Sequence, residues 1–345
     1  MRAVRAAAEE ELLEQLRGAR ASGARVPDFF IVGHAKCGTT ALYQMLQGHP
    51  QVFLPQIKEP EFLSRAPFPA PAPGDRPRVL PRTLDSYLAL FARAGAAQIA
   101  GEASTEYLRT PVAAERIFAL NPEARIVTML REPAGFLRSL QLQLLQIGVE
   151  SERDLERAIA LEPERRAGRR IPRGCEWPPA LLYTSHVRYT EQLRGYRELF
   201  GRERVVTVIY DDFLRDNAAV LAEVLRFLGV DGSAEIEPQR ANPTFRVRSR
   251  AAERMINGLA VGSGPVASKL KRVLEIATPQ RLRRAAHKAA LGVAIEREPP
   301  PPDERFMLAL RRRFEPEVRS IGEYLGRDLA ALWGYDRLGR GEPGD

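Results

Sequence analysis

The chain has 345 residues, of which 44% are hydrophobic and 28% are charged, and its formal net charge at pH 7 is +8. This composition is typical of a globular chain with a core, and it excludes a disordered polymer and a collagen-like repeat. The length exceeds the usual size of one domain but is compatible with one large α/β domain.

Residues 1–26 are predicted to form an N-terminal helical extension, with a short polar helix at residues 9–20. Acidic residues stand where a signal peptide would be apolar, and no run of residues approaches the roughly 18 apolar residues of a membrane span. We therefore expect a cytoplasmic protein. Its two cysteines, Cys37 and Cys175, are too few for a disulfide framework or a cysteine-based metal site, so we expect free thiols.

A short apolar run at residues 28–33 predicts a buried strand, and a helical pattern follows it. The connecting segment GHAKCGTT, residues 33–40, has the shape of a phosphate-binding loop, because its glycines permit tight turns and the next helix presents its positive end to an anion. The nucleoside-triphosphate signature wants lysine directly after the last glycine, but here Thr39 follows Gly38 and the lysine is Lys36. A plain glycine turn that opens a helix is the alternative.

Four further short strands are predicted at residues 52–54, 99–103, 125–130 and 204–210. Helical patterns separate or follow them at residues 112–120, 134–147, 187–200 and 218–228. This alternation predicts an α/β fold: a P-loop-like three-layer fold with a central, mainly parallel five-stranded sheet flanked by helices. Ligands of such sheets bind beyond the carboxyl ends of the strands. Residues 27–340 are predicted to form one domain.

Lysine is rare in this chain, which has five lysines against 47 arginines. Before residue 269 the only lysines are Lys36 and Lys58, and both lie in predicted loops. A lysine kept in so arginine-rich a chain points to a site that needs a compact ammonium, with chance placement as the alternative.

Residues 246–288 hold eleven lysines or arginines and two acids, a local excess of +9 that can account for the whole net charge. We predict a basic helical segment at residues 246–298, within the same domain. This charge pattern favours one face that meets an anionic or membrane-surface partner, and it argues against a general nucleic-acid coat. A solvated basic helix face is the alternative.

The segment FFIVGHAKCGTTALYQML, residues 29–46, resembles the 5′-phosphosulfate loop of sulfotransferases that use 3′-phosphoadenosine 5′-phosphosulfate (PAPS). The similarity is strongest to the branch that contains heparan-sulfate-type and many bacterial enzymes, and it covers most of residues 27–336. Four more segments are similar to those of this family: IKEPEFLS at 57–64, GEASTEYL at 101–108, IVTMLREPAGFLRSL at 126–140 and LGRDLAALWGY at 325–335.

The resemblance implies that PAPS is the cosubstrate, that adenosine 3′,5′-bisphosphate is the product, and that no metal is required. Around the 5′-phosphate it places loop residues that offer backbone N–H groups, hydroxyls and one charge. These are Lys36, Cys37, Gly38, Thr39 and Thr40. Lys36 is the implied catalytic cation beside the leaving oxygen, where the reaction needs charge stabilisation.

The 3′-phosphate is implied to bind Arg131 and Ser139, which stand eight positions apart as in the family. Arginine suits this role because its planar fork donates two hydrogen bonds to a phosphate. Arg248, with Arg246 beside it, is the candidate for the late arginine that completes this site. A simple basic loop is the alternative for the pair.

Glu59 is the implied general base, because the family's glutamate in the KE pair takes the acceptor's proton, and Lys58 beside it favours the ionised carboxylate. A surface ion pair is the alternative reading of Lys58 and Glu59. His34 and Glu102 are rival candidates for the base. Ala103 stands where several glycan-modifying relatives carry a lysine, so one contact to the cosubstrate is expected to be missing or supplied from elsewhere.

The predicted reaction moves a sulfuryl group to a hydroxyl, or an amine, of a carbohydrate, a glycolipid or a small molecule. The first alternative is an ATP-dependent phosphotransferase, which would need a magnesium-binding aspartate at a strand end, with Asp211 as the candidate. The second alternative is a non-catalytic protein that binds anionic partners through residues 246–288.

Overall fold

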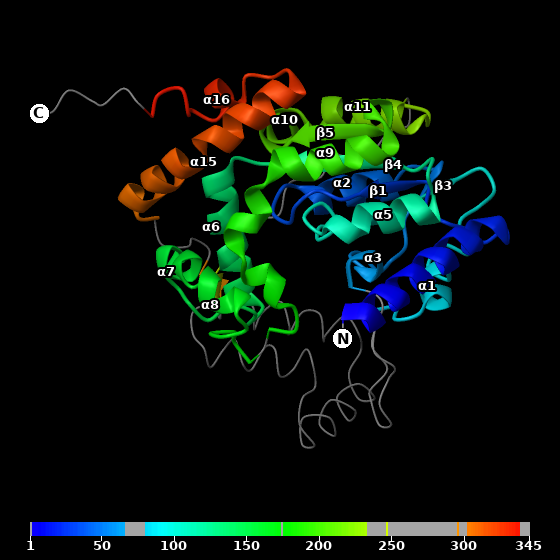
Figure 1. The fold of residues 1–345 in the computed structure, drawn as a ribbon. Coiled ribbons are helices and arrows are strands. Elements are labelled where there is room, and N and C mark those ends of the chain that lie inside the picture. Colours follow the sequence, from blue (N-terminus) through cyan, green and yellow to red (C-terminus); the bar gives the residue numbers. More distant parts are fainter. Residues whose placement is uncertain are drawn as a thin grey trace, which may run out of the picture. The chain divides into compact units, whose positions relative to one another are not determined.

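The computed structural model describes residues 2–65, 80–173, 175–232 and 302–338, and the backbone of residues 246–247 and 295–296 (Figure 1). The chain divides into two compact units, which we describe one at a time. Unit 1 comprises Met1–Pro133, Ser185–Asn242 and Phe314–Asp345, and unit 2 comprises Ala134–Thr184 and Pro243–Arg313.

A five-stranded sheet forms the centre of unit 1. Its strands are β1 (Phe29–Ile31), β2 (Val52–Phe53), β3 (Ile99–Ala103), β4 (Arg125–Leu130) and β5 (Val205–Ile209). The strand order is β2-β3-β1-β4-β5, and every neighbouring pair is parallel. The α/β fold with a parallel five-stranded sheet, predicted from the alternation of strands and helices, is therefore confirmed.

Helices cover both faces of this sheet. Those of unit 1 are α1 (Arg2–Ala21), α2 (Thr39–Gln47), α3 (Phe62–Arg65), α4 (Leu84–Leu88), α5 (Pro111–Leu120), α9 (Tyr189–Phe200), α10 (Tyr210–Arg215), α11 (Asn217–Leu228) and α16 (Leu329–Leu332). Right-handed crossovers between parallel strands put α2 on one face and α5 and α9 on the other. Consistently, α5 packs against α1 and α9, whereas α2 packs against α11 (Figure 1).

Unit 2 contains α6 (Pro133–Gln146, from Ala134 onward), α7 (Leu155–Ala160), α8 (Glu162–Arg166) and the 3₁₀ turn η1 (Pro178–Leu181). A buried ion pair holds this part together: Arg165 donates to Glu150, which also accepts the hydroxyl of Tyr183 at 2.9 Å. The long helix α15 (Glu304–Leu325) has residues in both units. Strands β6 (Arg246–Val247) and β7 (Ile295–Glu296) pair antiparallel, and residues 248–294 lie outside the described residues.

Two glycines allow the strands to pack closely at β1. A Cβ on Gly101 of β3 would lie 2.1 Å from the ring of Phe29, and a Cβ on Gly33 would lie 2.0 Å from Met129 N on β4. All three residues of β1 are fully buried, so this strand has no freedom to move away. The chain therefore leaves β1 along a path that only glycine permits.

Among the helices that the structure describes, none is both long enough and apolar enough to cross a membrane.

We expect Gly33→Ala to destabilise the fold by about 2 kcal/mol or more, because the added methyl group meets backbone atoms that cannot rotate away. Gly18→Ala is the matched control: Gly18 is exposed on α1, a Cβ there meets no atom within 4 Å, and the change should stabilise the helix by up to about 1 kcal/mol. Urea unfolding measures both. Equal stability of the two variants would contradict the close packing at β4.

Candidate active site

The predicted phosphate loop lies between β1 and α2, at the carboxyl end of the sheet. Gly38 precedes α2 with φ 90°, and a Cβ there would lie 3.1 Å from the ring of Phe213. Thr39 and Thr40 form the first turn of α2, and no described side chain caps this helix. The first backbone N–H groups of α2 are therefore directed towards a position where an anion can bind.

Two predicted site residues that are far apart in the sequence meet at this loop. Arg131, at the end of β4, donates from Nη1 to the backbone oxygen of Lys36 at 3.1 Å. Its guanidinium lies over the ring of Tyr210, 4.8 Å from the ring centre, and its backbone oxygen accepts the hydroxyl of Tyr189. Three contacts, two of the guanidinium and one of the backbone oxygen, thus hold Arg131 beside the loop.

Burial controls the charge of the loop residues. It lowers the pKa of Lys36, and the nearby Arg131 lowers it further. Burial also raises the pKa of Cys37 to about 12, so this thiol stays protonated at neutral pH. Both Lys36 and Arg131 would gain from an anion between them, because their positive charges repel each other. These residues fit a phosphate or phosphosulfate group.

His34 is buried in the loop, where its Nε2 lies 3.1 Å from Oε1 of Gln192. The amide nitrogen of Gln192 donates to Ser185 O at 2.9 Å, so the amide oxygen faces His34 and Nε2 carries the proton. Burial lowers the pKa of His34 to about 3, with a smaller lowering by Arg109. His34 is therefore neutral at physiological pH and a weak base.

Glu59 lies next to the end of β3. Its backbone N–H donates to Ala103 O at 2.9 Å, and its φ is 60°. The side chain is 35% exposed and pairs with Lys58, so the carboxylate can reach a ligand. Ala103 contributes this backbone contact to Glu59.

A second carboxylate, Glu61, lies beside Glu59. Its backbone N–H donates to Ser104 Oγ at 3.0 Å, and its side chain pairs with Arg65. Burial raises the pKa of Glu61 to about 7, against the opposing charge of Arg65. Residue 61 is a carboxylate whose charge changes near neutral pH, which the sequence pattern did not reveal.

Glu102 is fully buried on β3, next to Ala103, whose backbone oxygen accepts the N–H of Glu59. Its Oε2 accepts the hydroxyls of Tyr87 (2.7 Å) and Tyr107 (2.9 Å), and Tyr107 in turn accepts the backbone N–H of Leu63. Burial raises the pKa of Glu102 to about 7, and the charge of Glu59 raises it further while the hydrogen bonds lower it. This position makes Glu102 a support of α3 and α4 rather than a group that touches a ligand.

Three other predicted residues are Ser139, Arg248 and Asp211, and of these Asp211 lies close enough to the loop for its charge to contribute to the raised pKa of Cys37. Ser139 is buried on α6, in unit 2. Arg248 lies outside the described residues, and only the backbone of Arg246 is described. Asp211, the magnesium candidate of the phosphotransferase alternative, accepts the indole N–H of Trp333 at 2.9 Å.

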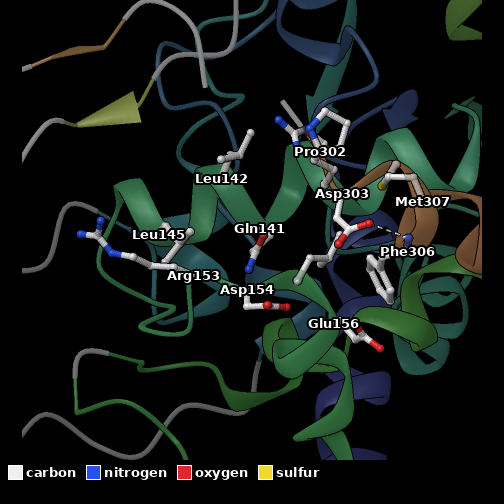
Figure 2. A pocket seen from close by; sticks show the side chains of 12 residues that line it. Gln141, Leu142, Leu145, Arg153, Asp154, Glu156, Pro302, Asp303, Phe306 and Met307 are labelled. Atoms are coloured by element: carbon white, nitrogen blue, oxygen red, sulfur yellow. Dashed lines mark hydrogen bonds between the residues drawn. The ribbon is translucent and has the colours of Figure 1, made fainter. Parts of the chain in front are cut away.

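Unit 2 has a cavity of about 210 Å³, lined by α6, the start of α7 and the start of α15 (Figure 2). Leu142, Leu145 and Phe306 form apolar walls, and Gln141 of α6 donates to Glu152 O at 3.0 Å. Ser139, although it is on α6, is not part of the described lining. This cavity therefore gives no support to the predicted role of Ser139.

Sequence reasoning missed Tyr210, Gln192 and Glu61. Tyr210 follows β5, so the rule that site residues follow strands could have found it. Gln192 stands 158 residues from His34 and carries no motif, so no signal in the sequence pointed to it.

Residues 27–234, more than half of the chain, match the Sulfotransferase family. The chain belongs to this family. The members for which this family is named are enzymes that move a sulfuryl group.

The crystal structure of a sulfotransferase from Alicyclobacillus acidocaldarius is similar to this protein, with a TM-score of 0.61 and 26% identity over 90% of this chain and 99% of that one. Human carbohydrate sulfotransferase 15 is 49% identical over 43 residues, and its rat and mouse counterparts match equally. That segment is 12% of this chain and only 8% of the human protein, so the chain spans a small part of the curated relatives it matches.

We expect Glu102→Gln to make the protein more stable than the wild type at pH 8 and nearly equal to it at pH 5. The pKa of Glu102 is raised in the folded state, so its contribution to stability is present below about pH 4.5 and is lost as the pH rises through about 7. Glutamine still accepts the two tyrosine hydroxyls and cannot ionise. Urea unfolding at both pH values should show a gain at pH 8 of up to about 3 kcal/mol.

Glu123→Gln is the control, because Glu123 is an exposed carboxylate. The difference in unfolding free energy between Glu123→Gln and the wild type should change far less between pH 5 and pH 8. A Glu102→Gln variant that is destabilised equally at pH 5 and pH 8 would contradict the raised pKa.

Proposed function

We propose that this protein is a sulfotransferase that uses PAPS and transfers its sulfuryl group to a hydroxyl of an acceptor. The observation that carries the proposal is the contact of Arg131 with the backbone of Lys36. This contact brings together two motifs whose contacting residues are 95 positions apart. In the family that the sequence resembles, the motif of Arg131 binds the 3′-phosphate and the motif of Lys36 binds the 5′-phosphosulfate of one nucleotide. An enzyme that binds only a small anion would not need both motifs.

The chain's own residues would hold the nucleotide from two sides. The backbone N–H groups and hydroxyls of Thr39 and Thr40 would bind the 5′-phosphate at the uncapped start of α2. Arg131 would bind the 3′-phosphate, and we propose Ser139, Cys37 and Arg248 as further cosubstrate contacts on the family pattern alone.

PAPS supplies a sulfuryl group on a good leaving group. In the proposed step the acceptor oxygen forms a bond to sulfur while the bond between sulfur and the 5′-phosphate oxygen breaks. Glu59 takes the proton of the acceptor hydroxyl, and Lys36 stabilises the charge that develops on the leaving oxygen. Adenosine 3′,5′-bisphosphate leaves with that oxygen, so the atoms balance without a metal or an oxidant.

Glu59 is a better candidate for the base than its two rivals. It is partly exposed, whereas His34 and Glu102 are buried and hold hydrogen bonds to Gln192 and to two tyrosines. The local similarity to a carbohydrate sulfotransferase favours a carbohydrate acceptor over a glycolipid or another small molecule. The phosphotransferase alternative is less favoured, because Asp211 already accepts a hydrogen bond from Trp333.

Titration calorimetry with the full chain tests the cosubstrate. We expect adenosine 3′,5′-bisphosphate to bind at least about tenfold more tightly than AMP, because Arg131 can pair with a phosphate that AMP lacks. Arg131→Gln should remove most of this preference. Arg125→Gln, at the opposite end of β4, should keep it. Equal affinities of the wild type for the two nucleotides would reject the proposed cosubstrate.

Glu59→Gln tests the base. The change keeps the size of the side chain but removes its ability to take a proton, so transfer from labelled PAPS should fall by about 10²-fold or more while nucleotide binding persists. Glu315→Gln is the control, since Glu315 is 31% exposed and ion-paired much as Glu59 is. A Glu59→Gln variant with the wild-type rate would reject Glu59 as the base.

A further inference from the structure

Strands β4 and β5 of unit 1 end side by side, and each is followed by a site residue and then by an acid. The last residues of the two strands are paired in the parallel register. Arg131 follows β4 and Tyr210 follows β5, and the guanidinium lies 4.8 Å from the centre of the tyrosine ring. The next residue is Glu132 in one segment and Asp211 in the other. Two acids therefore directly follow the contact between Arg131 and Tyr210.

Either acid would compete with a phosphate for Arg131 if its carboxylate could pair with the guanidinium. Arginine forms strong two-pronged hydrogen bonds with carboxylates as well as with phosphates. In the part of the chain that the structure describes, however, no acid forms an ion pair with Arg131, whose guanidinium contacts Lys36 O and the ring of Tyr210. The carboxylates of Glu132 and Asp211 have other partners.

These partners belong to the α16 segment, residues 325–335. The indole N–H of Trp333 donates to Asp211 Oδ2 at 2.9 Å. The hydroxyl of Tyr335 donates to Glu132 Oε1 at 2.5 Å. Each of the two acids thus accepts a hydrogen bond from one aromatic side chain of the same segment.

The α16 segment is itself held in place, so these hydrogen bonds have defined directions. Trp333 is 4% exposed and Tyr335 is 1% exposed, and the side chain of Asp328 caps α16. Arg327 pairs with Asp212 of α10 through hydrogen bonds of 2.5 and 3.3 Å, and α16 lies near α10 (Figure 1). The segment is therefore attached to the turn after β5 at two consecutive acids and to the turn after β4 at one.

We infer that Trp333 and Tyr335 are positioning residues of the nucleotide site. They hold the carboxylates of Asp211 and Glu132 away from Arg131, whose guanidinium therefore remains available to the 3′-phosphate. The inference rests on the proposed function. Neutral N–H and O–H donors suit this role, because they occupy a carboxylate without adding a positive charge that would itself attract the phosphate.

Tyr335→Phe tests this role with little disturbance of the fold, since it removes one hydroxyl. Glu132 then loses a partner and can pair with Arg131, so the affinity for adenosine 3′,5′-bisphosphate should fall about fivefold. AMP lacks the 3′-phosphate, and its affinity should stay within about twofold of the wild type. Tyr196→Phe is the matched control, because its buried hydroxyl donates to Tyr107 O at 3.0 Å in the same unit, and it should change neither affinity. Titration calorimetry with the full chain measures both nucleotides.

A second substitution separates this role from support of the fold alone. Glu132→Gln keeps the size of the side chain and removes its charge, so Tyr335→Phe/Glu132→Gln should return to within about twofold of the wild-type affinity for adenosine 3′,5′-bisphosphate. Glu132→Gln alone should change this affinity by less than about twofold, because Tyr335 already holds the carboxylate. Trp333→Phe, alone and combined with Asp211→Asn, makes the same comparison at the other acid, so one pair decides if a variant of the other does not fold.

An unchanged affinity of Tyr335→Phe and Trp333→Phe for adenosine 3′,5′-bisphosphate overturns the inference. An equal loss for both nucleotides, or double variants that stay weak, overturns it as well, because the hydrogen bonds would then only support the fold. An equal gain from Glu132→Gln with and without the hydroxyl of Tyr335 has the same meaning. A wild type that binds adenosine 3′,5′-bisphosphate no more tightly than AMP would instead reject the proposed cosubstrate, and the inference with it.

Discussion

The close approach of the chain to β4 at Gly33 is the constraint on which the candidate site depends. A side chain at this position would collide with Met129, so the chain leaves β1 pressed against its neighbour. The backbone N–H of His34 donates to Met129 O at 3.3 Å, and the loop continues to Lys36, where it meets Arg131, the first residue after β4. The loop is thus shaped by β4, and the arginine that contacts it directly follows this strand.

The sequence predicted the sheet well because buried parallel strands are short apolar runs with sharp ends. Residues 99–103 and 125–130 were predicted as the structure has them, in β3 and β4. The predicted strand at 28–33 is longer than β1, since the chain turns into the loop after Ile31. The first helix was predicted at 9–20 but spans Arg2–Ala21, because its first turns are alanine- and arginine-rich and lack an apolar period that would reveal them.

The candidate site could be predicted only in part, for a different reason. Lys36 and Arg131 follow strands and carry a motif, and before their contact was known both were predicted to bind one nucleotide, Lys36 at its 5′-phosphosulfate and Arg131 at its 3′-phosphate. The hydrogen-bond partners of the buried polar groups could not be predicted. Gln192 reaches His34, and Tyr87 and Tyr107 reach Glu102, because the elements that carry them pack together in the fold, and no sequence spacing indicates this. Burial raises the pKa of Glu61 and Glu102 to about 7. Because burial depends on the whole fold, a local sequence pattern cannot predict which carboxylates change charge near neutral pH.

Backbone strain gives an independent reason to place chemistry in these two loops. Four described non-glycine residues have positive φ: Lys36, Glu59, Glu61 and Arg170. Each such residue costs about 1–2 kcal/mol, and Glu59 also precedes a proline, where extended backbone is normal. Bonds from the backbone of Glu59 and Glu61 to Ala103 and Ser104 hold the strained segment in place. Glycine would remove the strain at all three loop positions, and strained non-glycine residues are found preferentially at functional sites, so this geometry supports the proposed roles of the two loops.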